Sequence, residues 1–144
     1  MDNYKKAMNV MDDLRVTMKK LHNKENKPFR KVEFHALLII LEFKSITMQK
    51  LGEELGVTKS RVTAIISKLT DKGFVEQVSD TKDKRKKLLQ LTKVGEEYMV
   101  SERAKYEEWF KQLWDKFTLE EQINWIHLIA KINRVIKGDL EEEE

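Results

Sequence analysis

Apolar residues recur at steps of three and four along almost the whole chain of 144 residues, and this spacing constrains the fold more than any other feature. Such steps place side chains on one stripe of an α-helix. The spacing holds in six segments and is interrupted between about residues 74 and 91. One proline and five glycines leave few breaks within the segments. The sequence therefore predicts a mainly helical domain with one non-helical interruption.

Both ends of the chain carry long apolar stripes. The first helix ends within residues 23–28, because a proline disfavours the α conformation in the residue before it, and its stripe consists of Tyr4, Met8, Met11, Leu14, Met18 and Leu21. Near the other end, a long helix at 93–117 precedes a capping box at 118–121. This box opens a last helix with a stripe of Ile123, Ile126, Ile129, Ile132 and Ile136. Such long stripes favour a homodimer, and core packing within one chain is the alternative.

A further helix, at about residues 31–43, is apolar on most of its circumference. Its apolar side chains are Phe34, Leu37, Leu38, Leu41 and, on the flank, Ile40. A helix that is apolar nearly all round must be enclosed by other elements. We therefore expect this helix to be the central buried element.

Residues 47–72 predict two short helices that meet at a steep angle. Leu51 and Leu55 lie one turn apart on a helix at 47–55, and the helix at 58–72 has an inward stripe of Val62, Ile65, Ile66 and Leu69. Between the helices, Gly52 would let the backbones approach and Gly56 permits a tight turn. This arrangement is typical of a helix-turn-helix.

The outward side of the helix at 58–72 carries short hydroxyls and flexible cations. Such groups suit base edges and phosphates, and Arg61 could donate to the O6 and N7 atoms of a guanine. A solvated helix face is the alternative. The candidate contact residues here are Lys59, Ser60, Arg61, Thr63, Ser67 and Lys68.

A β-hairpin is expected directly after these helices, with strands at 74–78 and 88–91. Its tip, residues 80–87, holds five cations and two carboxylates, which favours a nearby anion. Next to a helix-turn-helix, such a loop would flank a DNA duplex. Asp83 lies two residues before Arg85 and could orient the guanidinium by a charge-assisted hydrogen bond. The tip candidates for DNA contact are Lys82, Asp83, Lys84 and Arg85.

Three stretches of the chain are similar to the MarR (multiple antibiotic resistance regulator) family of winged helix-turn-helix transcriptional regulators. They are residues 51–58, the D-x-R sequence at 83–85, and Leu-x-Leu-Thr-x-x-Gly at 89–95. The resemblance implies that Arg85 reads the minor groove and that a homodimer forms through the first and last helices. Ala64 and Gln77 depart from the family, which often has arginine at both places. Groove-reading positions implied by the resemblance are Ser60, Arg61, Thr63 and Ser67.

Together these observations predict a single domain, mainly α with a small β-hairpin wing. Residues 1–30 and 93–138 would form the dimer, residues 31–92 the DNA-binding lobe, and residues 139–144 an acidic tail. The expected function is that of a sequence-specific regulator of transcription, a repressor, that binds a pseudo-palindromic double-stranded DNA operator as a homodimer. The resemblance adds a small aromatic or acidic effector. The alternative function is a helical protein-interaction module with a basic face and no sequence-specific DNA binding.

Charge supports a polyanionic partner. The formal net charge of the whole chain is +3, although residues 139–144 contribute five negative charges. The net charge of residues 1–138 is therefore more positive than that of the whole chain by five units. The tail itself is most simply a solvated, frayed end. A sharper hypothesis is that it competes with DNA for the basic wing.

Several other classes of function lack support. The absence of cysteine excludes disulfides and thiolate metal sites. No cofactor or metal is expected, since His22, His35 and His127 show no ligand spacing; His35 could instead face an effector cavity or simply be partly buried. Trp109, Trp114 and Trp125 fit core or dimer packing better than a ligand cage. No catalytic motif is present, so we expect no enzyme activity. No apolar run approaches a membrane span, so we expect a cytoplasmic protein with no membrane partner.

Overall fold

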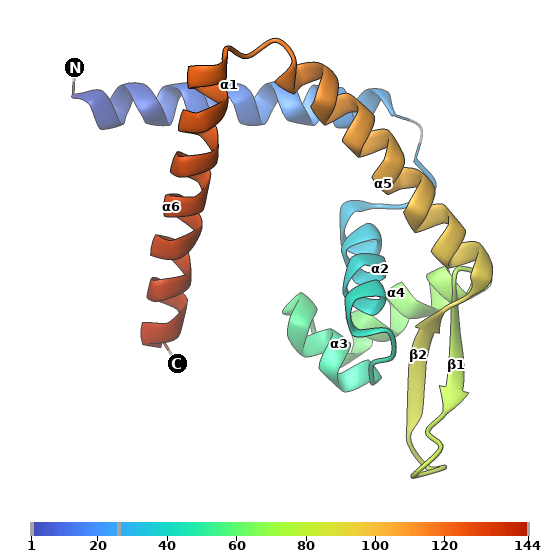
Figure 1. The fold of residues 1–144 in the computed structure, drawn as a ribbon. Helices are drawn as coiled ribbons and strands as arrows, with labels where there is room; N and C mark the ends of the chain where they lie inside the picture. The colour runs from blue at the N-terminus through green and yellow to red at the C-terminus, as the bar shows by residue number, and fades with distance from the viewer. Residues whose placement is uncertain (1, 26, 144) are drawn as a thin grey trace.

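The structure, a computed structural model, describes residues 2–25 and 27–143. These ranges contain six helices and one antiparallel hairpin (Figure 1). The fold is mainly α with a β-hairpin wing, as predicted. The elements are α1 (Asn3–Lys24), α2 (Lys31–Phe43), α3 (Met48–Leu55), α4 (Lys59–Asp71), β1 (Val75–Ser79), β2 (Lys87–Leu91), α5 (Lys93–Trp114) and α6 (Leu119–Glu143).

The core lies where α2 meets α3, α4 and the hairpin. Leu37, Ile40, Leu51 and Leu69 are fully buried there, which confirms α2 as the central element. The expectation that other elements enclose α2 on nearly all sides was wrong. Leu38 and Leu41 are each 43% exposed, whereas Ile39 is buried, because the core covers only one side of this helix.

The two helices of the helix-turn-helix begin and end within one residue of the predicted bounds. The hydroxyl of Thr47 accepts a hydrogen bond from the Lys50 amide at 3.1 Å and so caps α3. Gly56 has φ of 68°, a left-handed conformation that favours glycine. The interpretation of Gly52 was wrong, because a Cβ added there would lie 3.5 Å from Val62 Cγ1, an ordinary contact distance.

The wing is hydrogen-bonded to the segment that connects α2 and α3. Its strands pair from Val75 opposite Leu91 to Ser79 opposite Lys87. Ile46, between α2 and α3, exchanges two backbone hydrogen bonds with Leu89, at 3.2 and 2.7 Å. These bonds fix the wing against the helix-turn-helix.

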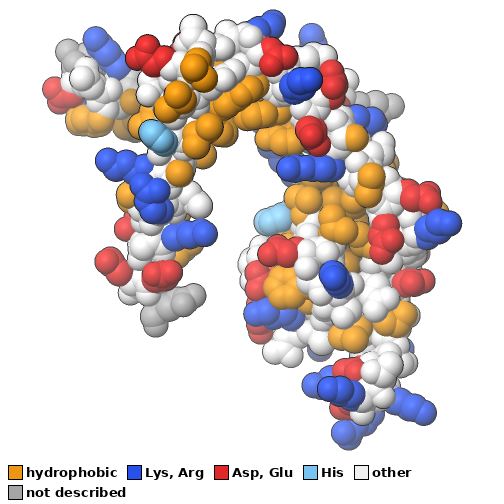
Figure 2. Space-filling model, viewed as in Figure 1, with side chains coloured by type: hydrophobic (Ala, Val, Ile, Leu, Met, Phe, Trp, Pro, Cys, Tyr) orange, Lys and Arg blue, Asp and Glu red, His pale blue; other side chains and the backbone are white. Residues whose placement is uncertain are grey.

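Helices α1, α5 and α6 extend away from this lobe as an arch (Figure 1). The predicted capping box of α6 is present: the Thr118 amide donates to Glu121, and the Glu121 amide donates to the Thr118 hydroxyl. Helix α6 continues to Glu143, so the acidic tail is helical and not frayed over residues 139–143, although these residues are exposed as predicted. Residue 144 lies outside the described residues. Glutamate is a good helix former, and no proline interrupts the run. Hydrophobic side chains line the inner side of the arch (Figure 2).

No helix in the described ranges is both long enough and apolar enough to span a membrane.

Candidate nucleic-acid interface

Helix α4 presents the predicted polar side to solvent. Thr58 caps the helix, since its hydroxyl accepts a hydrogen bond from the Arg61 amide at 3.2 Å. The inward stripe of Val62, Ile65, Ile66 and Leu69 is buried as predicted. The six candidate residues are all exposed: Lys59, Ser60, Arg61, Thr63, Ser67 and Lys68.

Some of the polar groups on this side of α4 already have partners within the protein. The hydroxyl of Thr63 donates to the Lys59 carbonyl at 2.8 Å, so Thr63 offers a methyl group and an acceptor. Ser60 Oγ lies 3.3 Å from Thr58 Oγ1. Lys68 Nζ lies 3.2 Å from the buried carboxylate of Glu33. The N-terminal half of α4 is therefore the part best able to contact a ligand.

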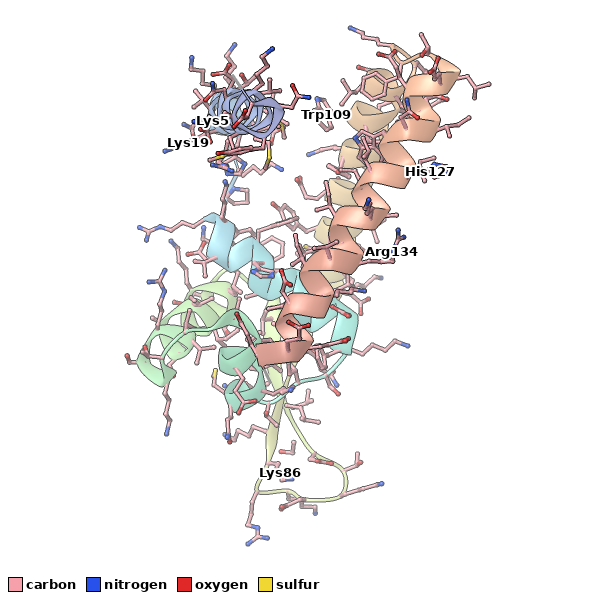
Figure 3. All side chains as sticks on the ribbon, turned by 90° about the vertical axis from the view of Figure 1, so that its left-hand side faces the viewer. Lys5, Lys19, Lys86, Trp109, His127 and Arg134 are labelled. Carbon is pink, nitrogen blue, oxygen red and sulfur yellow. The ribbon has the colours of Figure 1, made fainter. Side chains whose placement is uncertain are left out.

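The wing tip holds its arginine in place. Asp83 Oδ1 accepts hydrogen bonds from both the amide and Nε of Arg85, at 3.1 and 3.2 Å. The predicted contact is thus present, and the Arg85 side chain remains 93% exposed. Lys86 lies near the end of the wing (Figure 3), and basic side chains cluster at the tip (Figure 2). Of the other tip candidates, Lys82 and Lys84 are exposed.

A cavity of about 480 Å³ lies between α1, the α1–α2 connection and α5. Its apolar walls include Met18, Leu21 and Trp109, and Trp109 lies on the α1 side of α5 (Figure 3). His35 does not line this cavity, contrary to the possibility raised by the sequence, whereas His22 does. Trp114 and Trp125 instead pack edge to face, with ring centres 5.5 Å apart, and join α5 to α6.

A charge network around the buried carboxylate of Glu102 forms one wall of the cavity. The Glu102 carboxylate accepts hydrogen bonds from Lys27 at 2.9 Å and from Lys105 at 3.2 Å. Burial acts to raise the pKa of Glu102, but these two bonds outweigh it and hold the pKa below its ordinary value of 4.5. Desolvation acts to lower the pKa of Lys27, yet its bonds to Glu102 and Glu25 raise that pKa above its ordinary value of 10.5.

The hydroxyl of Tyr98 also faces this region. It is buried and has no hydrogen-bond partner among the described residues. Burial, reinforced by the negative charge of Glu102, raises the pKa of Tyr98, so the hydroxyl is a neutral donor at physiological pH. An unpaired buried hydroxyl beside a cavity can donate to a polar guest.

Replacing Glu102 by Gln is expected to lower the free energy of unfolding by about 2 kcal/mol at pH 7 and by much less at pH 3. The folded-state pKa lies below 4.5, so the ionised carboxylate stabilises the fold above that pH. This contribution is lost as the pH falls through the folded-state pKa. Urea unfolding at both pH values checks the prediction, with Glu107→Gln on the exposed side of α5 as the control. An equal loss at both pH values would contradict it.

Sequence reasoning missed three residues that shape these sites: Glu33, Glu102 and Lys72. Glu33 and Glu102 were not singled out by the sequence, yet both side chains are buried. One signal was available for Glu33, which stands three residues after the N-cap residue Arg30, at the position of a capping carboxylate; its Oε2 accepts a hydrogen bond from the Arg30 amide at 2.9 Å. In the described ranges, no three His, Asp or Glu side chains gather in a group that could hold a metal ion.

The exposed second helix of a helix-turn-helix, beside a hairpin with an oriented arginine, defines a winged helix-turn-helix protein. Comparison with known proteins agrees. The model of the MarR family matches residues 30–87. The chain is 26% identical to the uncharacterized HTH-type transcriptional regulator YpoP of Bacillus subtilis (strain 168), over 84% of this chain and 89% of that protein. It is 21% identical to the HTH-type transcriptional regulator BilQ of Clostridioides difficile (strain CD3), over 94% and 95% of the two chains.

Solved structures share the fold over nearly the whole chain. A MarR family protein from Bacillus stearothermophilus superposes with a TM-score of 0.77 at 19% identity, covering 95% of this chain and 99% of that one. Streptococcus pneumoniae FabT, solved in complex with DNA, superposes with a TM-score of 0.72 at 22% identity, covering 98% and 96%. The chain therefore has the winged helix-turn-helix fold of these structures and is similar to the MarR family over residues 30–87.

Proposed function

We propose that this protein is a sequence-specific double-stranded DNA-binding regulator of transcription that acts as a homodimeric repressor. The observation that carries the proposal is that one lobe presents both the exposed polar side of α4 and the oriented, 93% exposed Arg85. The match of the MarR family model to residues 30–87 and the fold shared with FabT, which was solved with DNA, support it. The proposal gives the protein no catalytic role and places it in the cytoplasm with its DNA.

In this proposal, affinity and specificity come from different groups. Lysines and arginines neutralise phosphates and release counterions, which gives affinity for any duplex. The N-terminal half of α4 enters the major groove, where Arg61 can bond a guanine and the Thr63 methyl can contact a thymine. Arg85 enters the adjacent minor groove, where a narrow groove attracts arginine.

The homodimer rests on the exposed stripes at the two ends of the chain. No residue of α1 or α6 is buried, and the five isoleucines of the α6 stripe are 44–53% exposed. A monomer with this much contiguous apolar surface is unusual, and a second copy would cover it. A twofold dimer implies an operator of two similar half-sites about 34 Å apart. The five isoleucines are Ile123, Ile126, Ile129, Ile132 and Ile136.

A small aromatic or acidic effector is the second part of the proposal. The cavity beside α1 combines apolar walls, which suit an aromatic ring, with the unpaired Tyr98 hydroxyl, which can donate to an acid group; Lys27 and Lys105 also line it but are paired with Glu102. PcaV of Streptomyces coelicolor, a regulator of similar fold, was solved with its natural ligand. An effector there would change the separation of the two α4 helices in the dimer and release the operator.

Salt dependence tests the proposal against a protein-interaction module with a basic face. For DNA binding, log affinity should fall with log salt by about 0.9 per phosphate contacted, and one duplex sequence should be preferred over random duplex. Fluorescence anisotropy with labelled duplexes at several salt concentrations measures both. Equal affinity for all duplexes would favour the alternative.

Arg85→Ala is expected to weaken operator binding about tenfold, because the wing loses its minor-groove contact. Asp83→Asn sharpens the test. It removes a negative charge near the phosphates, so charge alone would strengthen binding, whereas loss of the bond that orients Arg85 should weaken it. Anisotropy titrations with the operator check both variants. Unchanged affinity of Arg85→Ala at moderate salt would count against the role of the wing.

Arg61→Ala is expected to cost about 1 to 3 kcal/mol of operator binding and to relax base preference at one position, if Arg61 bonds a guanine. Competition with operators substituted one base pair at a time measures the preference. An equal loss on random duplex would mean that Arg61 contacts only phosphate.

A further inference from the structure

We propose that Lys68 is a positioning residue and not a phosphate contact: the buried carboxylate of Glu33 holds Lys68 and thereby fixes α4 on α2. The sequence placed Lys68 among the DNA contacts, but its side chain has a partner inside the protein. The inference rests on the proposed function, because it concerns how the recognition helix is held for DNA.

Both oxygens of Glu33 are engaged. Oε1 lies 3.2 Å from Lys68 Nζ, and Oε2 accepts the Arg30 amide at 2.9 Å. The Glu33 side chain is only 5% exposed. A carboxylate taken out of water needs a compensating charge, and removing its partner leaves an uncompensated buried charge. If Lys68 moved to a phosphate, the buried carboxylate of Glu33 would lose its partner. The resulting loss of stability would exceed the gain from one exposed phosphate contact.

A second lysine, one turn further along, shows the same behaviour. Lys72 Nζ donates to the Pro28 carbonyl and lies 4.8 Å from the centre of the Phe29 ring. The cations at the C-terminal end of α4 thus turn back to the segment before and at the start of α2. In the described part of the chain, Lys59 and Arg61 form no such ion pair. The two ends of α4 therefore have separate tasks, DNA contact at the N-terminal end and anchoring at the C-terminal end.

The experiment compares salt slopes, because only a phosphate contact contributes to them. Operator and random duplexes are titrated at several salt concentrations with the full-length protein and its variants Lys68→Met, Glu33→Gln and Lys59→Met. Lys59→Met is the matched control and should lower the slope by about 0.9. Lys68→Met should keep the wild-type slope but weaken operator binding about tenfold, with random duplex unaffected.

Glu33→Gln separates the two roles most sharply. The amide oxygen of glutamine can still accept the Arg30 amide, but the charge that holds Lys68 is gone. Positioning predicts weaker operator binding at an unchanged slope, with the double variant no weaker than either single variant. If Lys68 is a phosphate contact that Glu33 restrains, Glu33→Gln will bind more tightly with a steeper slope, and this result overturns the inference.

Two further readouts keep the test decisive. If Lys68→Met does not fold, the double variant Lys68→Met with Glu33→Gln is used instead, because it removes both charges. Its salt slope should equal that of the wild-type protein if Lys68 is a positioning residue. A slope lower than that of the wild-type protein by about 0.9 would identify Lys68 as a phosphate contact and overturn the inference. Wild-type protein that prefers no duplex would overturn the proposed function instead. The two failures are therefore distinguishable.

Discussion

Ile129→Asp is expected to convert the protein from a dimer to a monomer at micromolar concentration. Ile129 is 44% exposed in the single chain and lies in the middle of the α6 stripe, where the proposed partner covers it. The partner would bury only the part of the Ile129 side chain that is still exposed, which contributes about 1 kcal/mol, and a twofold axis repeats each substitution in both subunits. The loss is therefore about 2 kcal/mol, or roughly thirtyfold in the dimer dissociation constant, before the larger cost of burying a carboxylate.

Sedimentation velocity across a range of protein concentrations measures this change. Lys131→Asp is the matched control, because it introduces the same carboxylate about 200° away around the helix. The control should remain a dimer. If Ile129→Asp has the same mass as the wild-type protein at every concentration, the α6 stripe does not form the interface.

Gly95→Ala is expected to lower the free energy of unfolding by about 3 kcal/mol, the upper end of the usual cost of overpacking. Gly95 is buried in the first turn of α5, where a Cβ would overlap the carbonyl oxygen of Phe74 and lie 3.1 Å from the carbonyl carbon. That oxygen accepts the Thr92 amide at 3.0 Å. The Thr92 hydroxyl in turn caps α5 at Gly95 and donates to the Gly73 carbonyl at 2.6 Å. An added methyl group must push these two backbones apart, and the join between wing and α5 weakens.

Urea unfolding at a fixed protein concentration measures the loss. Gly138→Ala is the control, since no atom lies within 4 Å of a Cβ added there. In the middle of a helix this change should stabilise the protein by up to about 1 kcal/mol. Equal stability of Gly95→Ala and wild-type protein would show that the close approach to Phe74 is not needed.

Local signals in the sequence were enough to predict most of the fold. The helix at 31–43 has the predicted bounds, and the predicted capping box joins Thr118 to Glu121, only three residues away. The bond from Arg85 to Asp83 spans two residues and was likewise predictable. Such features depend on spacing and side-chain chemistry within one turn of chain, which a single sequence contains.

What the sequence could not predict depends on contacts between distant segments. The partner of Lys68 is 35 residues away, and that of Lys27 is 75 residues away, so neither ion pair leaves a periodic signal. Leu38 was expected to be buried because α2 looked apolar all round, but only one of its sides meets the core. The reason for glycine at residue 95 likewise appears only once Phe74 is seen beside it.

Selection of bound duplexes from a random pool tests the central claim most directly, namely that α4 and the wing together read double-stranded DNA. The account predicts enrichment of one pseudo-palindrome whose half-sites are centred about one helical turn apart. It also predicts that the enriched duplex outcompetes a scrambled duplex of the same composition at physiological salt. A selected pool with no common sequence, bound no more tightly than heparin, would contradict the account.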